Sequence, residues 1–230
     1  MRSRPPSLVV ENGFMRIAYG EQLAAIEDAL LSMTRLVQQS VDQATHALLE
    51  ADMEAADAVV TGDLVIDQVR DTIEDQVYEL LALQQPVAGD LRMLLATARM
   101  IADLERMGDL AVHVAKVAKM RYPAVAIPDE MLPTMQRASE VAIAMVGELT
   151  KIIGERDLSA VAAIEARDEE MDQLRRQEFR IILSDSWSHG VEPAIDLALL
   201  GRYYERIADH AVTLARRIVY LVTGEPAHSS

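Results

Sequence analysis

Apolar residues recur at steps of three and four along most of this chain, the spacing that places them on one face of an α-helix. The first such series consists of Leu23, Ile26, Leu30, Met33, Val37, Val41, Ala44 and Leu48. It predicts a helix from about Ala18 to Leu49. A second helix is expected to begin after Asp52, a residue type that caps helix N-termini. It should end at Gln85-Pro86, because the residue before a proline avoids the helical region.

The same pattern predicts four more helices and no strand of useful length. The third should start at a cap on Asp90 and reach about Met120, and the last three should lie near residues 131–155, 158–187 and 192–223. The expected domains are an N-terminal unit at 15–122, a proline-containing linker at 123–130 and a C-terminal unit at 131–225. Residues 1–14 are expected to form a disordered arm, because Pro5-Pro6 and Asn12-Gly13 interrupt helical order; whether Met1 or Met15 is the initiator stays open.

The two units repeat each other in register. Asp52, Asp63 and Asp67 correspond to Asp157, Asp168 and Asp172 at an offset of 105 residues. Farther along, DLERMGDLA at 103–111 corresponds to YYERIADHA at 203–211 at an offset of 100. The offset between the repeats therefore changes from 105 to 100 residues, and this change falls at the predicted turn ALQQPVAGD. A turn is where an insertion between repeats is expected. We therefore predict an all-α fold of two tandem three-helix bundles with six long helices.

Composition narrows the classes of function. The 230 residues are 50% hydrophobic but only 4% aromatic, which suits packed helices, and the net charge of -15 disfavours binding to nucleic acid and anionic lipid. There is no cysteine, and hence no disulfide or thiolate metal site. No run of about 18 apolar residues predicts a transmembrane helix, and the N-terminus does not read as a signal peptide. A cytoplasmic location without membrane insertion is expected.

The candidate chemistry lies in pairs of acidic residues four positions apart. Glu105 with Asp109, and Glu205 with Asp209, occupy equivalent positions in the two repeats. This spacing puts both carboxylates of a pair on one helix face, where they repel each other unless a cation lies between them.

A second acidic pair lies on the middle helix of each repeat. The pairs are Asp63 with Asp67 and Asp168 with Asp172. If the middle and third helices are antiparallel neighbours, four carboxylates face one another across each contact. Their oxygens suit divalent or trivalent metal ions, with Fe, Mn, Zn, Mg and Ca left open. The alternative is a solvated acidic face, and Asp63 and Asp168 are the members for which an orientation toward water stays open.

Sequence signatures of common enzyme classes are missing. The chain has no G-x-x-x-x-G-K-[ST], G-x-G-x-x-G, H-E-x-x-H or G-x-S-x-G. We therefore predict that the protein is not an enzyme. A metal-dependent enzyme or metal-storage protein on a carboxylate-lined bundle remains an alternative, as does a purely structural scaffold.

At these motifs the sequence resembles the PhoU family of bacterial phosphate-transport accessory proteins. The resemblance rests on DLERMGDLAVHVAK at 103–116, YYERIADHAVTLARRIVYLVTGE at 203–225, QQPVAGDLR at 84–92 and MRIAYGEQLAAIEDAL at 15–30. It covers about residues 15–225. The family's metal-cluster ligands fall on Glu105, Asp109, Glu205 and Asp209, and its helix-two acids fall on Asp63, Asp67, Asp168 and Asp172.

The resemblance implies a regulatory adaptor. Such a protein links the ATPase of the phosphate ABC transporter to a sensor histidine kinase, represses the phosphate-starvation response when phosphate is plentiful, restrains uptake and often forms a homodimer. Two departures between the repeats bear on the metal sites. Leu110 stands where the second repeat has His210, and Asp103 stands where it has Tyr203. The two sites are therefore expected to differ.

Overall fold

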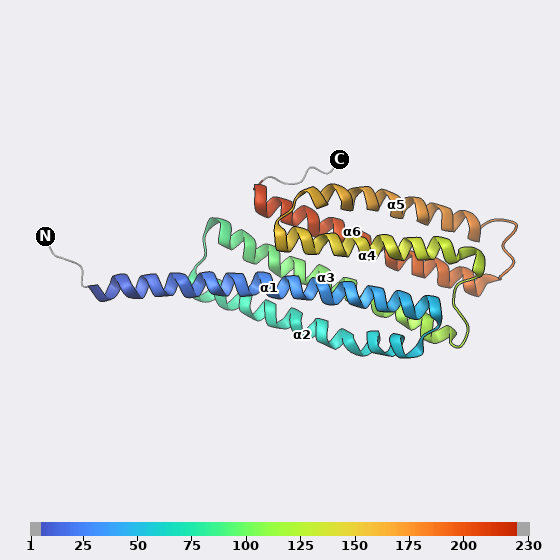
Figure 1. Cartoon of the computed structure of the whole chain (residues 1–230), viewed down its shortest axis with the longest axis horizontal. Helices are drawn as coiled ribbons and strands as arrows, with labels where there is room; N and C mark the ends of the chain where they lie inside the picture. The colour runs from blue at the N-terminus through green and yellow to red at the C-terminus, as the bar shows by residue number, and fades with distance from the viewer. Residues whose placement is uncertain (1–5, 225–230) are drawn as a thin grey trace.

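The helices and their order agree with the sequence pattern. A computed structural model describes the backbone of residues 6–224 and the side chains of residues 19–224. This part of the chain contains six α-helices and no strand. The elements are α1 (Pro6–Glu50), α2 (Met53–Gln84), α3 (Ala88–Arg121), the short 3₁₀ helix Asp129–Met131, α4 (Leu132–Glu155), α5 (Ser159–Ile182) and α6 (Val191–Thr223). The all-α prediction is confirmed (Figure 1).

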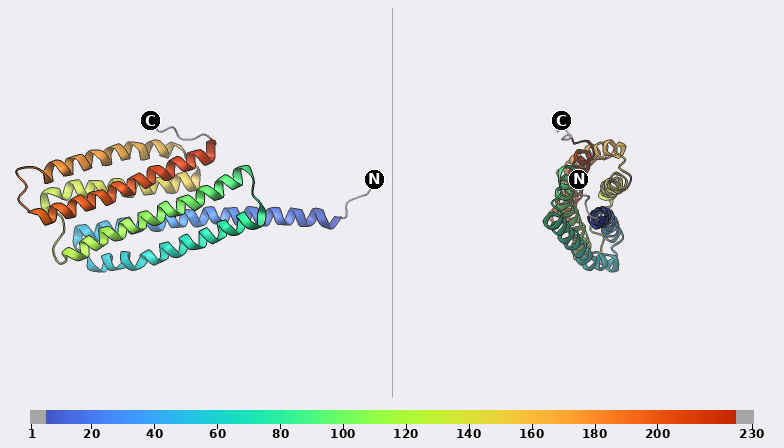
Figure 2. Two further views of the ribbon diagram at one scale, coloured as in Figure 1. Left: turned by 180° about the vertical axis from the view of Figure 1, so that it is seen from behind. Right: turned by 90° about the vertical axis from the view of Figure 1, so that its left-hand side faces the viewer.

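The helices form two three-helix bundles that lie side by side. Helices α1, α2 and α3 pack against one another, as do α4, α5 and α6. The bundles meet through α1 against α4 and α3 against α6, which leaves α2 and α5 on the outside (Figures 1 and 2). The prediction of two tandem three-helix bundles is therefore confirmed.

The predicted apolar face of the first helix forms part of the core. Its members from Ile26 to Leu48 are buried, and Leu23 packs partly buried against them. In the same bundle, Ile73 and Leu104 are completely buried. Each side chain of this size contributes about 1.5–3 kcal/mol when it is removed from water. Burial of the helical stripes therefore holds the long helices together.

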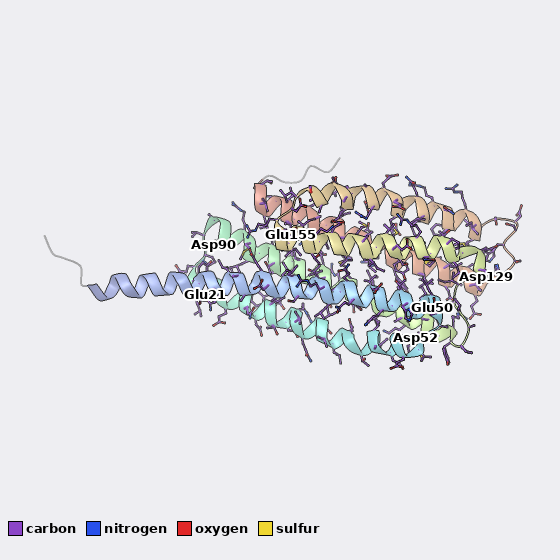
Figure 3. The ribbon with its side chains drawn as sticks, in the orientation of Figure 1. Glu21, Glu50, Asp52, Asp90, Asp129 and Glu155 are labelled. Atoms are coloured by element: carbon purple, nitrogen blue, oxygen red, sulfur yellow. The ribbon has the colours of Figure 1, made fainter. Side chains whose placement is uncertain are left out.

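The predicted start of α2 is confirmed, and that of α3 is shifted. The Asp52 carboxylate accepts a hydrogen bond from the backbone N–H of Ala55 at 3.0 Å and caps α2. Helix α3 begins at Ala88, after Val87, so Asp90 lies within its first turn rather than at the cap (Figure 3). A carboxylate there still interacts favourably with the positive end of the helix dipole.

The predicted disordered arm is wrong where the structure describes it. Residues 6–14 belong to α1, which projects beyond the bundles as a single helix (Figure 1). Pro6 stands at the first helical position, where its missing N–H costs nothing. Gly13 within a helix costs only about 1 kcal/mol relative to alanine. Residues 1–5 of the predicted arm, and residue 225 at the end of the predicted C-terminal unit, lie outside the described residues.

The connection after α5 also differs from the prediction. The helix ends at Ile182 instead of near Trp187. The hydroxyl of Ser184 donates to the carbonyl of Ile181 at 2.7 Å, so a side chain satisfies a backbone group at the helix end. Helix α3 ends at Arg121 and α4 begins at Leu132, and the connection between them includes the 3₁₀ helix. In the described part of the chain, no helix combines the length and apolar character required to cross a bilayer.

Candidate functional site

All eight predicted site residues lie where two helices of one bundle meet. We define the first carboxylate cluster as Asp63 and Asp67 of α2 with Glu105 and Asp109 of α3. The second carboxylate cluster consists of Asp168 and Asp172 of α5 with Glu205 and Asp209 of α6. Helix α2 packs against α3, and α5 packs against α6. The fold therefore brings the two acidic pairs of each repeat to one contact between helices.

The charges of the first cluster act on one another across that contact. Burial, followed by the nearby charges of Asp109 and Asp67, raises the pKa of Asp63. Burial and then Asp109 also raise the pKa of Glu105, against the opposing influence of Arg70. Asp63 is half-buried, and its Oδ1 lies beside Gly108 of the α3 motif.

The second cluster repeats this electrostatic arrangement. Burial raises the pKa of Asp168, with further contributions from Asp209 and Asp172. Burial and Glu205 raise the pKa of Asp209, while Arg202 lowers it. In both repeats, the first acid of the middle helix thus lies close to the Asp of the third-helix motif. Like charges held together in this way make the region attractive to a cation.

A small residue between the two motif acids lets the helices approach closely. A Cβ on Gly108 would lie 3.1 Å from Cδ1 of Ile66 and 3.5 Å from Oδ1 of Asp63. The equivalent residue in the second repeat is Ala208, which is completely buried. Close packing at this position holds the Asp63 carboxylate next to the α3 motif.

The two clusters differ in how arginine neutralises them. Among the described residues, no ion pair within 4.0 Å joins Asp63, Glu105 or Asp109 to a basic side chain. In the second cluster, Nη1 of Arg202 lies 2.9 Å from Oε2 of Glu205 and 3.9 Å from Oδ2 of Asp209. The first repeat has Ala102 at the position of Arg202. In the first cluster, Nη2 of Arg70 lies 3.8 Å from Oδ1 of Asp67. Arginine therefore pairs with the motif acids of the second cluster but not with those of the first.

A buried ion pair supports the second cluster, and sequence reasoning missed it. Nη1 of Arg175 donates to Oε2 of Glu178 at 2.5 Å, and Nε of Arg175 lies 3.4 Å from Oε2 of Glu205. The pair fills the space beside Gly201, where an added Cβ would lie 2.0 Å from both side chains. The first repeat has Ile73 and Ile101 at the positions of Glu178 and Gly201.

The sequence itself contains a signal for this ion pair, because the residues at its position differ between the two repeats. The offsets of 105 and 100 residues align an apolar pair, Ile73 and Ile101, with a charged residue and a glycine. A charge is rarely buried without a partner, so a basic neighbour was to be expected. The partner, Arg175, is three positions before Glu178 on the same helix face.

The two departures noted between the motifs meet in space. Nδ1 of His210 lies 3.1 Å from Oδ1 of the buried Asp103, and Nη2 of Arg217 lies 3.3 Å from Oδ2. The ring of Tyr203 stacks on His113 with centroids 5.2 Å apart. Asp103 and His210 therefore form part of the contact between α3 and α6 and join the two repeats.

The chemistry of the clusters fits a hard cation, although their side chains are not arranged as ready ligands. Each cluster offers carboxylate oxygens only, the donors that Mg²⁺, Ca²⁺ and Mn²⁺ prefer. Within the described residues, however, no three His, Asp or Glu side chains converge as metal ligands do. The carboxylates would have to rotate toward a common point to hold an ion. Metal binding therefore remains a prediction.

A tandem pair of three-helix repeats, each with an acidic motif on its third helix, defines a class of all-helical repeat proteins. The PhoU domain family matches residues 30–118 and 135–218, one segment in each bundle. The chain belongs to the PhoU family. This confirms the resemblance predicted from the motifs.

Named relatives cover nearly the same length. The chain is 40% identical over 210 residues to the phosphate-specific transport system accessory protein PhoU homolog 2 of Mycobacterium bovis, a match spanning 91% of this chain and 99% of the relative. It is also 40% identical to homolog 1 of Mycobacterium leprae, over 91% of this chain and 95% of that protein.

Solved structures agree with the fold. The crystal structure of the phosphate transport system regulatory protein PhoU from Streptococcus pneumoniae superposes with a TM-score of 0.80 at 26% identity, covering 92% of this chain and all of that chain. The crystal structure of PhoU from Pseudomonas aeruginosa also gives 0.80 at 26% identity, covering 90% of this chain and all of that one.

Proposed function

We propose that this protein is an accessory protein of a phosphate-transport system that represses the phosphate-starvation response and restrains phosphate uptake. The names of its relatives, phosphate-specific transport system accessory proteins, support this assignment. So does the match of PhoU domains to both bundles. The role is regulatory rather than enzymatic.

In this proposal the protein acts in the cytoplasm as an adaptor. It binds the ATPase of the phosphate ABC transporter and a sensor histidine kinase, and it works as a homodimer. The net charge of -15 favours basic protein surfaces over nucleic acid.

We further propose that metal ions bind at the carboxylate clusters and tie the second and third helix of each repeat together. One observation carries this part: in both repeats the acidic pairs of two helices lie at the same helix contact, where burial and the nearby Asp charges raise the pKa of Asp63 and of Asp168. A bound cation would neutralise this repulsion. The first cluster is the better site, because no arginine pairs with its motif acids Glu105 and Asp109.

The same clusters support a second candidate function. A carboxylate-lined bundle that binds metal without any signalling role would show the same geometry. The two candidates differ in their effect on gene expression, because only the adaptor changes the output of phosphate-starvation genes when phosphate is abundant.

The first experiment measures a phosphate-starvation reporter in a strain that lacks this gene, grown in abundant phosphate. High output, returned to low output by the wild-type gene, supports the adaptor. Complementation with Glu105→Gln/Asp109→Asn should fail to restore repression if the first cluster is required. The control is Asp75→Asn/Glu79→Gln, an exposed pair with the same spacing on α2.

Each outcome separates the candidates. Low output in the deletion strain argues against the adaptor. If, in addition, the purified wild-type protein contains metal by elemental analysis, the second candidate is favoured. Repression restored equally by both variants would show that signalling does not require the first cluster.

A further inference from the structure

An arginine-lined groove lies between the two repeats, away from both carboxylate clusters. Helices α3 and α6 run antiparallel there, so the first half of α3 lies beside the end of α6 (Figure 2). The groove has a volume of about 230 Å³. Its lining consists of Arg92, Leu95, Ala96 and Arg99 of α3 with Arg217 and Tyr220 of α6.

The groove concentrates positive charge on an acidic protein. Three of its lining residues are arginines and none is acidic, although the chain carries 37 acidic and 22 basic residues. Arg92 and Arg99 are exposed and have no ion pair with any described residue. They are seven positions apart, so both lie on the same face of α3 about 10 Å apart along its axis.

A buried carboxylate holds the third arginine in place. The side chain of Arg217 is 31% exposed, and its Nη2 lies 3.3 Å from Oδ2 of Asp103, whose own side chain is 8% exposed. Its Nη1 is buried and has no hydrogen-bond partner among the described residues. One carboxylate thus orients this guanidinium and leaves the charges of Arg92 and Arg99 uncompensated.

At the equivalent position in the other repeat, side chains of the protein itself neutralise one another's charges. At an offset of 100 residues, Arg92 becomes Glu192 and Ala96 becomes Asp196. There Arg121 donates to Glu192 at 2.5 Å and to Asp196 at 2.6 Å. The two ends of the α3–α6 contact therefore differ: Arg121 is paired with two carboxylates at one end, whereas Arg92 and Arg99 at the other end have no ion pair with a described residue.

We propose that this groove binds a phosphate-type group, the compact and multiply charged oxyanion that several guanidinium groups recognise together. Arginine offers planar pairs of N–H donors that match phosphate oxygens. The Tyr220 hydroxyl adds one donor, and Leu95 packs against whatever carries the group. This site is independent of metal binding at the carboxylate clusters.

Calorimetric titration of the full-length protein with inorganic pyrophosphate tests the site. Arg92→Ala/Arg99→Ala should weaken binding by at least about tenfold, because two charge-assisted contacts are lost. The control Arg35→Ala/Arg180→Ala removes the same charge from exposed positions outside the groove and should bind like the wild type. Circular dichroism confirms that each variant is folded.

A parallel binding measurement with phosphatidylglycerol vesicles shows whether the phosphate group that binds is a free anion or part of a lipid headgroup. Pyrophosphate binding that is lost only in the groove variant supports a free anion as the ligand. Vesicle binding lost only in that variant, without pyrophosphate binding, supports the same chemistry in a lipid headgroup. The proposal is overturned if neither probe binds, or if the groove variant and the control behave alike.

Discussion

Removing one partner of the buried Arg175–Glu178 ion pair should strongly destabilise the protein. The pair has a 2.5 Å contact, and its side chains are only 10% and 3% exposed. In Glu178→Ile, the Arg175 charge keeps its 3.4 Å contact with Glu205 and its position 4.7 Å above the Phe179 ring, but it loses its closest partner. An uncompensated buried charge of this kind costs about 3–5 kcal/mol of unfolding free energy.

Replacing both partners should cost much less. Burial, together with the nearby Glu205 charge, raises the pKa of Glu178 even though Arg175 opposes the shift, so the environment as a whole disfavours the charged carboxylate. Apolar replacement of a buried pair is often neutral or stabilising. The double variant Arg175→Met/Glu178→Ile places at 178 the residue type found at Ile73 in the first repeat. Its unfolding free energy should exceed that of either single variant by about 2 kcal/mol or more.

Urea unfolding followed by circular dichroism measures the free energies of unfolding of the four proteins in this double-mutant cycle. These are the wild type, Arg175→Met, Glu178→Ile and the double variant. The exposed pair Arg137–Glu170, with a 2.7 Å contact and side chains 52% and 35% exposed, is the matched control. Its coupling energy should stay below about 1 kcal/mol. Additive effects of the two buried substitutions, within about 0.5 kcal/mol, would refute the reasoning.

Three further predictions concern the carboxylates. Asp52→Ala removes the cap of α2 and should cost about 1 kcal/mol, measured by urea unfolding against Asp52→Asn, which keeps a capping side chain. Arg202→Ala removes the nearer of the two arginines that contact Glu205 and should tighten Mn²⁺ binding to the second cluster about two- to fivefold by calorimetry; weaker binding would contradict this. Because the folded-state pKa values of Asp63 and Glu105 are raised, their contribution to stability is complete below about pH 4 and is lost as the pH rises through those values. In metal-free protein, the Tm of Asp63→Asn/Glu105→Gln should therefore fall less between about pH 4 and pH 7 than the Tm of the wild type. An equal fall in Tm would contradict the raised pKa values of Asp63 and Glu105.

The regular elements were predictable because they depend on local patterns. Apolar steps of three and four fixed the helical faces, and Asp52 marked the start of α2. Weak signals near chain ends misled the prediction. Gly13 and Pro6 are compatible with a helix, so α1 extends through the expected arm. The start of α3 moved from Asp90 because capping propensity is a small term beside the packing of the whole helix.

The sequence alone determined the repeat, the helical bundles and the eight acidic candidates, because periodicity and internal alignment are properties of the chain itself. Only the tertiary structure decided which charges meet. It placed Arg202 on the second cluster, left the first cluster without an ion pair at its motif acids, and brought Arg217 beside Arg92 and Arg99. These contacts join residues on different helices or depend on burial. Their energies are therefore set by distance and desolvation, which spacing along the chain does not encode.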